Sequence, residues 1–396
     1  MIRYLQFLVA LAFAACTPAT TVRAGDLLVV GYVDIADDPR HTNLTASGGI
    51  VLRTRGHPLD GAKVAMGDLA AIGRALNVEF SLVTARAGGL AAFVDTVTKL
   101  RNDSGARMIF LDGPAAAIRA TADAIDGRDA LLFNVSAEDD ELRGRACSAH
   151  LMHLIPSLAM RTDAIAQFLV ARRWRNVLAL EGESLADAAF VSAFERSAKR
   201  FGARIVERRK LAFGRDPRLR DQNNLMLLTG GVSYDAILVA DETEEVGRYL
   251  PYQTQLPRPI VGSAGLMATA WHFAWEHNGG PQLSLRFRRS AHRDMRSVDW
   301  AAWVGIRAIA EAVTRIKSTE FVAVASYLRS EALRIDGFKG PALSFRAWDN
   351  QLRQPIFLAT DLAVIDRAPM RQFIHATQNL DTLGHERSES ACRLNQ

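Results

Sequence analysis

Residues with carboxylate, hydroxyl or small side chains follow several short apolar segments of this chain. Ligands of open α/β sheets bind beyond the carboxyl ends of the strands, which is where such residues would lie. Carboxylates there favour a cationic or metal-bearing ligand, or a neutral polyol or alcohol, as much as an amino acid. Acidic residues in such loops also cap helices, so each has a structural alternative. The candidates are Asp34, Gly113, Ser136, Ala137 and Glu138 in the first part of the chain, and Glu183, Ser184, Asp241, Glu242 and Ser263 in the second.

Motifs that would indicate catalysis are not found. The sequence has no G-x-G-x-x-G after its first apolar segment and no G-x-x-x-x-G-K-[ST], which bind dinucleotides and phosphates. Residues 231–235 approach the G-x-S-x-G nucleophile elbow, but Asp235 stands where Gly is required. We therefore expect a binding protein that is not an enzyme and needs no cofactor.

Histidines suggest metal binding in two places, and neither has the required spacing. His272 and His277 would point to diverging faces of a helix. Cys147 lies near His150 and His153, but no fourth ligand is evident. We expect no metal site in either place.

The first residues predict export. Residues 1–24 combine Arg3, an apolar stretch too short to span a bilayer, and a small-residue cleavage site that ends before Gly25, as in a secretory signal peptide. No later segment is long and apolar enough to be a transmembrane helix. We expect a periplasmic protein. A lipid anchor at Cys16 is the alternative, since Phe13 to Cys16 is similar to a lipobox with Phe in place of the usual Leu.

Export also bears on the remaining cysteines. Cys147 and Cys392 could form a disulfide in an oxidising compartment, or remain two buried thiols. Basic residues exceed acidic ones only slightly, 48 against 43, and their runs are interpreted as solvated helix ends and loops. Nucleic-acid binding is therefore not expected. These basic runs are residues 172–175, 208–220 and 286–296.

Strand and helix signals alternate in two successive units, which predicts two doubly wound parallel sheets. The first unit has expected strands at 27–33, 78–83, 108–111 and 130–135, with helices at 61–76, 90–100 and 114–125. The second has helices at 162–171 and 185–201, with strands at 176–180, 204–206, 235–240 and 259–262. Helices at 298–316 and 321–333 follow, and then a hairpin with strands 343–345 and 354–358. This last third suggests a chain that returns to the first lobe and then to the second.

The order of these elements, together with Val29 to Val33, Gly61 to Ala65, Trp174 to Val177 and Gly340 to Phe345, resembles type I periplasmic binding proteins. The similar branch includes the leucine/isoleucine/valine-binding receptors of ABC transporters. The resemblance covers nearly the whole mature chain. It implies two lobes joined by a multi-crossover hinge, a monomer that closes on a small-molecule ligand, and an ABC permease in the inner membrane as partner. The expected first lobe is 25–145 plus about 268–339, the second is 146–267 plus about 340–375, and 376–396 form a tail.

Five segments of the last third are similar to a narrower subgroup. It contains the ABC substrate-binding proteins associated with pyrroloquinoline-quinone (PQQ)-dependent alcohol dehydrogenase systems. This resemblance implies a link to alcohol oxidation and a periplasmic dehydrogenase as a further partner. The alternative is a non-transport sensor or accessory protein of that system. The segments are 271–272, 299–303, 336–340, 351–355 and 380–384.

The first-lobe binding pattern departs from that of amino-acid receptors, which use hydroxyls and backbone amides for the ligand carboxylate. Residues 113–115 contain no Ser or Thr, and Pro114 removes one backbone donor. Ser136 is the only hydroxyl among the first-lobe candidates. The sequence therefore makes an ordinary amino-acid receptor the less favoured form of the hypothesis.

Overall fold

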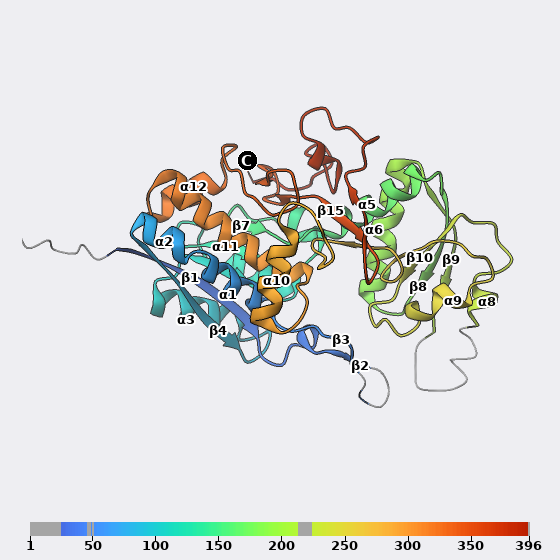
Figure 1. The fold of residues 1–396 in the computed structure, drawn as a ribbon, viewed down its shortest axis with the longest axis horizontal. Coiled ribbons are helices and arrows are strands. Elements are labelled where there is room, and N and C mark those ends of the chain that lie inside the picture. The colour runs from blue at the N-terminus through green and yellow to red at the C-terminus, as the bar shows by residue number, and fades with distance from the viewer. Residues whose placement is uncertain (1–24, 46–48, 50, 213–223, 395–396) are drawn as a thin grey trace, which may run out of the picture.

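The computed structural model describes residues 25–45, 49, 51–212 and 224–394. The expected signal peptide and Cys16 lie outside these residues. Figure 1 shows two lobes: the first carries the N-terminal strand and the orange helices, and the second carries the green and yellow elements. Within the described residues, no helix combines the length and apolar character that crossing a membrane requires.

The first lobe is built on a parallel five-stranded sheet in the order β4-β1-β5-β6-β7. Val30 and Tyr32 of β1 point into the core on one face, and Val33 points into the core on the other. Helices α1, α2, α10, α11 and α12 cover the first face, and α3 and α4 cover the second. The sheet is therefore doubly wound, as predicted. Its strands are β1 Asp26–Ile35, β4 Val78–Ala87, β5 Met108–Leu111, β6 Leu131–Asn134 and β7 Leu151–His153. The helices are α1 Leu59–Asp68, α2 Ala70–Leu76, α3 Phe93–Ser104, α4 Ala115–Ala124, α10 Gly280–Ala291, α11 Ser297–Ile316 and α12 Phe321–Leu328.

The second lobe has a parallel four-stranded sheet in the order β11-β10-β8-β9. Val177 and Leu238 face the pair of long helices α5 and α6, whereas Leu178 and Ile237 face the short helices on the other side. These elements are β8 Asn176–Glu181, β9 Arg204–Lys210, β10 Ala236–Ala240, β11 Ile260–Gly262, α5 Leu158–Ala171, α6 Leu185–Phe201, α8 Leu225–Leu228, η3 Gly247–Tyr249 and α9 Leu250–Gln253.

The lobes are joined by a small antiparallel sheet, β12-β15-β16, as well as by the segment between β7 and α5. Phe357 of β15 belongs to the first-lobe core, and its neighbours Ile356 and Leu358 belong to the core around α5. Successive residues of one strand thus pack in different lobes. These strands are β12 Met267–Thr269, β15 Ile356–Ala359 and β16 Val364–Ala368.

Two expectations about these connections need correction. The first-lobe boundary was placed at residue 145, but β7 pairs in parallel with β6, so the chain crosses only after His153. A strand of three residues gives too little pattern to be recognised. The predicted hairpin also differs, because β13 (Ser344–Phe345) pairs with β14 (Leu352–Arg353), while β15 pairs with β12 and β16. Pro355 has no backbone N–H and separates the two ladders.

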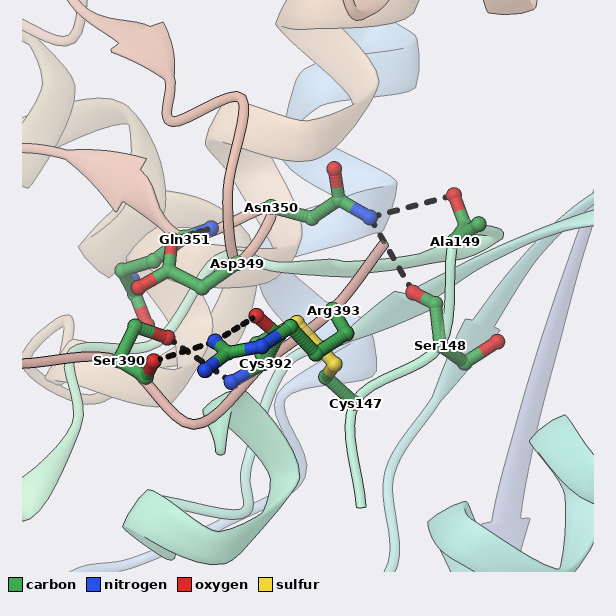
Figure 2. Close-up of a disulfide and its surroundings, with 9 residues drawn as sticks. All are labelled: Cys147, Ser148, Ala149, Asp349, Asn350, Gln351, Ser390, Cys392 and Arg393. Carbon is green, nitrogen blue, oxygen red and sulfur yellow. Dashed lines mark hydrogen bonds between the residues drawn. A yellow bond between two sulfur atoms is a disulfide. The ribbon is translucent and has the colours of Figure 1, made fainter. Parts of the chain in front are cut away.

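The C-terminal segment is attached to both lobes. Cys147, between β6 and β7, forms a disulfide with Cys392, one of the two alternatives that the sequence left open, with 5.7 Å between their Cα atoms (Figure 2). Beside it, the Asn350 side chain donates to the carbonyls of Ser148 and Ala149, both at 3.2 Å. The bond fixes the end of the chain to the first lobe.

The same segment contacts the second lobe through a buried carboxylate. Asp163 of α5 pairs with Arg196 at 2.6 Å and with Arg200 at 3.0 Å, both on α6. It also accepts a hydrogen bond from the backbone N–H of Gly384 at 2.7 Å. Arg200 in turn donates to the Gly384 carbonyl at 2.6 Å. The segment therefore runs from a second-lobe ion-pair network to a first-lobe disulfide.

Candidate ligand-binding cleft

A cavity of about 390 Å³ lies between the two lobes. Asp112 and Ser136, which follow β5 and β6, line it from the first lobe. Asp241 and Ser263, which follow β10 and β11, line it from the second. The carboxyl ends of strands in both sheets therefore face one space, where a ligand is expected to bind.

The structure places half of the predicted site residues on this cavity. The residues that line it are Ser136, Glu138, Asp241, Glu242 and Ser263. Those that do not are Asp34, Gly113, Ala137, Glu183 and Ser184. A role in ligand contact stays a prediction for every one of them.

The residues away from the cavity have positions that explain their absence. Asp34 lies within β1 rather than in the loop after it, and its carboxylate contacts Arg86 and His57. Ser184 caps α6 by accepting from the backbone N–H of Asp187 at 3.0 Å. Gly113 exchanges two hydrogen bonds with the Ser136 hydroxyl, both at 3.1 Å.

The structure also explains why Ala137 and Glu183 do not line the cavity. Ala137 accepts from Asn134 and Arg143, both at 2.8 Å, so its carbonyl is used inside the first lobe. Glu183 is exposed on the second lobe.

Several carboxylates on the cavity are already occupied by protein groups. Asp241 is fully buried and accepts from the backbone N–H groups of Val246 at 2.9 Å and Gly247 at 2.8 Å. It also accepts from the Thr243 hydroxyl at 2.8 Å. Glu138 forms an ion pair with Arg161 of α5. Asp241 therefore stabilises the loop after β10, as a capping carboxylate does, and Glu138 joins the lobes. Neither carboxylate is left without a partner for a cationic ligand to fill.

Asp112 is the most deeply buried carboxylate of the first-lobe wall. It accepts from the Tyr32 hydroxyl at 3.0 Å, and His41 Nε2 lies 2.9 Å away. Arg40 lies 3.4 Å from its second oxygen. Burial by itself raises the pKa of Asp112, but the contacts with His41 and Arg40 outweigh it and leave this pKa below its ordinary value. Asp112 is therefore an ionised group whose oxygens already contact Tyr32, His41 and Arg40.

Two arginines on the cavity have no such partner. Among the described residues, neither the Arg55 nor the Arg296 guanidinium makes a hydrogen bond or ion pair, and Arg55 Nε is buried without an acceptor. Burial lowers the pKa of Arg296, the nearby Asp299 carboxylate raises it in part, and the charges of Arg55 and Arg293 lower it again. Arginine nevertheless remains protonated in proteins. Val298, in the first turn of α11, lines the same cavity, so the positive end of that helix faces it.

Sequence reasoning missed these cations. Arg296 belongs to the basic run 286–296, which was interpreted as solvated, and Arg55 lies in a polar loop without a motif. Both reach the cavity only through the tertiary fold. The only local signal near Arg55 was the presence of Gly56 and Pro58, which favour a turn. Both residues also line the cavity.

The histidine and cysteine groups considered for metal binding do not converge. Cys147 is used by the disulfide, His150 contacts Ser148 and the Ala122 carbonyl, and His153 contacts Asn134. The segment with His272 and His277 is not helical.

Comparison with known proteins identifies solved structures that share this architecture. No protein-family model matches the chain, and no curated protein matches its sequence. Solved structures do match. An ABC transporter substrate-binding protein from Sphaerobacter thermophilus has a TM-score of 0.70 at 15% identity, covering 87% of this chain and 98% of its own. A branched-chain amino acid ABC transporter periplasmic ligand-binding protein from Burkholderia xenovorans has a TM-score of 0.70 at 14% identity, covering 93% and 100%.

A third match is an ABC transporter solute-binding protein from R. palustris, solved in complex with benzoate, with a TM-score of 0.64 at 10% identity and coverage of 93% and 99%. At these identities the likeness shows the fold. The structural neighbours are substrate-binding proteins of ABC transporters, of the leucine/isoleucine/valine-binding type, and the chain has the two-lobed fold of type I periplasmic binding proteins.

Proposed function

We propose that this protein is the extracytoplasmic ligand-binding component of an ABC transporter and that it binds a small organic anion between its lobes. The observation that carries this proposal is the pair of unpartnered guanidinium groups, Arg55 and Arg296, on the interlobe cavity. Both groups are half-buried on the cavity and form no ion pair with the described residues, and a charge withdrawn from water without a paired counter-charge is costly. A bound carboxylate would supply that counter-charge and accept several hydrogen bonds from the two forks.

The carboxylates of the cavity support the same ligand class. An amino acid brings an ammonium group that needs an anionic partner, but Asp241 and Glu138 are already satisfied by protein groups. An anion without an ammonium fits this arrangement better. The benzoate held by the R. palustris protein is a ligand of this kind.

We also propose that the lobes move as units about the segments that join them. These are the connection from β7 to α5, the β12 connection, and the residues between Leu352 of the first-lobe core and Ile356 of the core around α5. Rigid-body closure about a few connecting residues is the usual motion of such proteins. It would bring Glu242 and Ser263 toward Arg55.

A link to PQQ-dependent alcohol oxidation is the finer form of this proposal. It rests on the five similar segments of the last third. Two of their residues, Trp271 and Trp300, stack in the first-lobe core with ring centroids 6.3 Å apart, so these segments also serve packing. Carboxylates fit this context because they are the oxidation products of primary alcohols, and PQQ is itself a polycarboxylate.

A thermal-shift and calorimetry screen tests the ligand class with matched compounds. Benzoate, benzyl alcohol and benzylamine share a ring and differ in charge; acetate, leucine and PQQ extend the set. We expect the carboxylates to stabilise the protein, by about 2.7 kcal/mol at a concentration of 100 times Kd. Stabilisation by the amine or the alcohol alone would contradict the anion proposal.

Arginine substitutions test whether the ligand binds at Arg55 and Arg296. Arg296→Gln and Arg55→Gln should each weaken binding of the best carboxylate by about tenfold or more, because each removes charge-assisted hydrogen bonds. Arg289→Gln is the matched control, since this residue is exposed at the end of α10. Equal affinity in all three variants would place the ligand elsewhere.

The non-transport alternative has its own readout. A sensor or accessory protein should co-purify with a periplasmic dehydrogenase and should not deliver ligand to reconstituted permease. If no compound shifts the melt while a dehydrogenase is recovered, the transport proposal is wrong.

A further inference from the structure

Asp34, His41 and His57 lie together on the first lobe beside the cavity. Asp34 is on β1, His41 ends the short helix η1 (Pro39–His41), and His57 lies just before α1. One possible ligand atom from each residue can be chosen so that all three atoms lie within 4.8 Å of one another. The two imidazole rings are 4.2 Å apart between centroids.

His41 has the bonding pattern of a metal ligand. Its side chain is only 7% exposed, and its Nε2 lies 2.9 Å from Asp112 Oδ2. Because the Asp112 carboxylate can only accept, Nε2 carries the proton, and Nδ1 of the neutral ring presents a lone pair. That Nδ1 is buried, and none of the described residues hydrogen-bonds to it. A carboxylate that fixes the tautomer of a histidine while the other nitrogen stays free is a recurrent feature of zinc sites.

Asp34 and His57 complete the group. Asp34 is 4% exposed and uses Oδ1 to accept from Arg86 Nε at 3.1 Å, while Oδ2 lies 3.2 Å from His57 Nδ1. Within the part of the chain that the structure describes, the His57 Nδ1 atom makes no hydrogen bond. Its side chain is 37% exposed, so the group is reachable from solvent.

We propose that Asp34, His41 and His57 bind a divalent transition-metal ion, with Asp112 as the hydrogen-bond partner that orients His41. Two imidazoles and one carboxylate suit Zn²⁺ and its neighbours, and they suit Ca²⁺ or Mg²⁺ poorly. Three protein ligands leave at least one position of a tetrahedral ion for water or another oxygen donor. His41 also lines the cavity, so the ion would lie at the wall of the ligand-binding cleft.

The surrounding charges are compatible with a cation. Two carboxylates, Asp34 and Asp112, face the histidines, and each also contacts an arginine, Arg86 and Arg40 respectively. Arg40 lies near Asp112 Oδ1 and leaves Oδ2 directed toward His41, whereas Arg86 contacts both oxygens of Asp34, of which Oδ2 also faces His57. The ion would therefore add to a polar cluster that is already ordered.

Zinc binding to the tag-free purified protein tests this inference without any assumption about the solute. After chelator treatment and its removal, a competition titration with a chromophoric chelator should give one Zn²⁺ per chain. His57→Gln and Asp34→Asn should weaken binding by at least tenfold, whereas His272→Gln should leave it unchanged. Circular dichroism and melting of each variant verify folding. His57 is the more exposed of the two histidines, so its substitution is the safer one.

Cobalt provides a second readout. Co²⁺ should replace Zn²⁺ and give visible absorption bands that disappear in His57→Gln, and excess Ca²⁺ should not displace it. Absence of stoichiometric binding in the wild-type protein, or its persistence in His57→Gln and Asp34→Asn, would overturn the proposal. Arg296→Gln should retain the metal, which keeps this result separate from the anion proposal.

Discussion

Arg53 Nη2, in the first-lobe strand β3 (Val51–Arg53), lies 3.2 Å from Oε2 of Glu244 in the second lobe. The same guanidinium lies 3.1 Å from Asp361, in the turn between β15 and β16. Glu244 lines the interlobe cavity. These contacts therefore connect the two lobes directly beside the proposed binding site.

The Arg53–Glu244 pair should favour the closed form weakly. A double-mutant cycle with Arg53→Gln and Glu244→Gln should give a coupling energy of about 0.2–1 kcal/mol in ligand affinity, because the pair is partly exposed. The coupling should fall at high salt. Calorimetric Kd values for the four proteins measure it. Zero coupling at low salt would show that the pair makes no contribution to closure.

Much of the fold was predictable because its signals are local. Helix α6 begins and ends as predicted, since Ser184 and Asp187 form a capping box and Gly202 adopts a left-handed conformation at the other end. The buried strands were recognisable as apolar runs. The strand β7 was missed because its pairing with β6 is set by the sheet and not by its three residues.

The site was less predictable because its decisive features depend on partners from distant segments. Asp241 has the expected position after β10, but its oxygens are used by the loop that follows. Arg296 looked solvated in a basic run, and only the packed lobes show that it lines the cavity without an ion pair among the described residues. His41 and His57 have no motif spacing, because η1 and the start of α1 are brought together by tertiary structure.

Removal of the disulfide should destabilise the protein. Cys392→Ser should lower the free energy of unfolding by about 2–5 kcal/mol, because the bond closes a loop with a sequence separation of 245 and restricts the unfolded chain. Urea unfolding with and without reductant measures the effect. Reductant should shift the wild-type transition and leave that of Cys147→Ser in place. If reductant shifts the transitions of the wild type and of Cys147→Ser equally, it acts on something other than this disulfide.

The buried Asp163 network should be more sensitive than surface ion pairs. Asp163→Asn removes the charge that two arginines face and weakens the contact with Gly384, so it should cost about 3–5 kcal/mol of stability. Asp123→Asn is the control, because its side chain is 72% exposed and its pair with Arg119 is long. Chemical denaturation measures both. If both variants lose a similar, small free energy of unfolding, the Asp163 network does not contribute to the stability of the fold.

Buried His153 should make the protein less stable in mild acid. Its side chain is 1% exposed, and burial, followed by the charge of Arg143, holds the pKa of His153 well below its ordinary value. Between that low pKa and the unfolded value of about 6.5, the unfolded chain binds more protons than the folded one. The free energy of unfolding therefore rises with pH in this window. The free energy of unfolding therefore decreases as the pH falls below about 6.5, and His153 contributes up to about 1.4 kcal/mol of this decrease per pH unit.

Urea titrations across about pH 5 to 7.5 measure this slope, and His153→Gln should reduce it. His277→Gln is the matched control because His277 is exposed, and it should leave the slope unchanged. The Asn134 side chain lies 3.1 Å from His153 Nδ1, so Gln can still offer an acceptor in place of the ring. A slope that is the same in wild type and His153→Gln would assign the acid sensitivity to other groups.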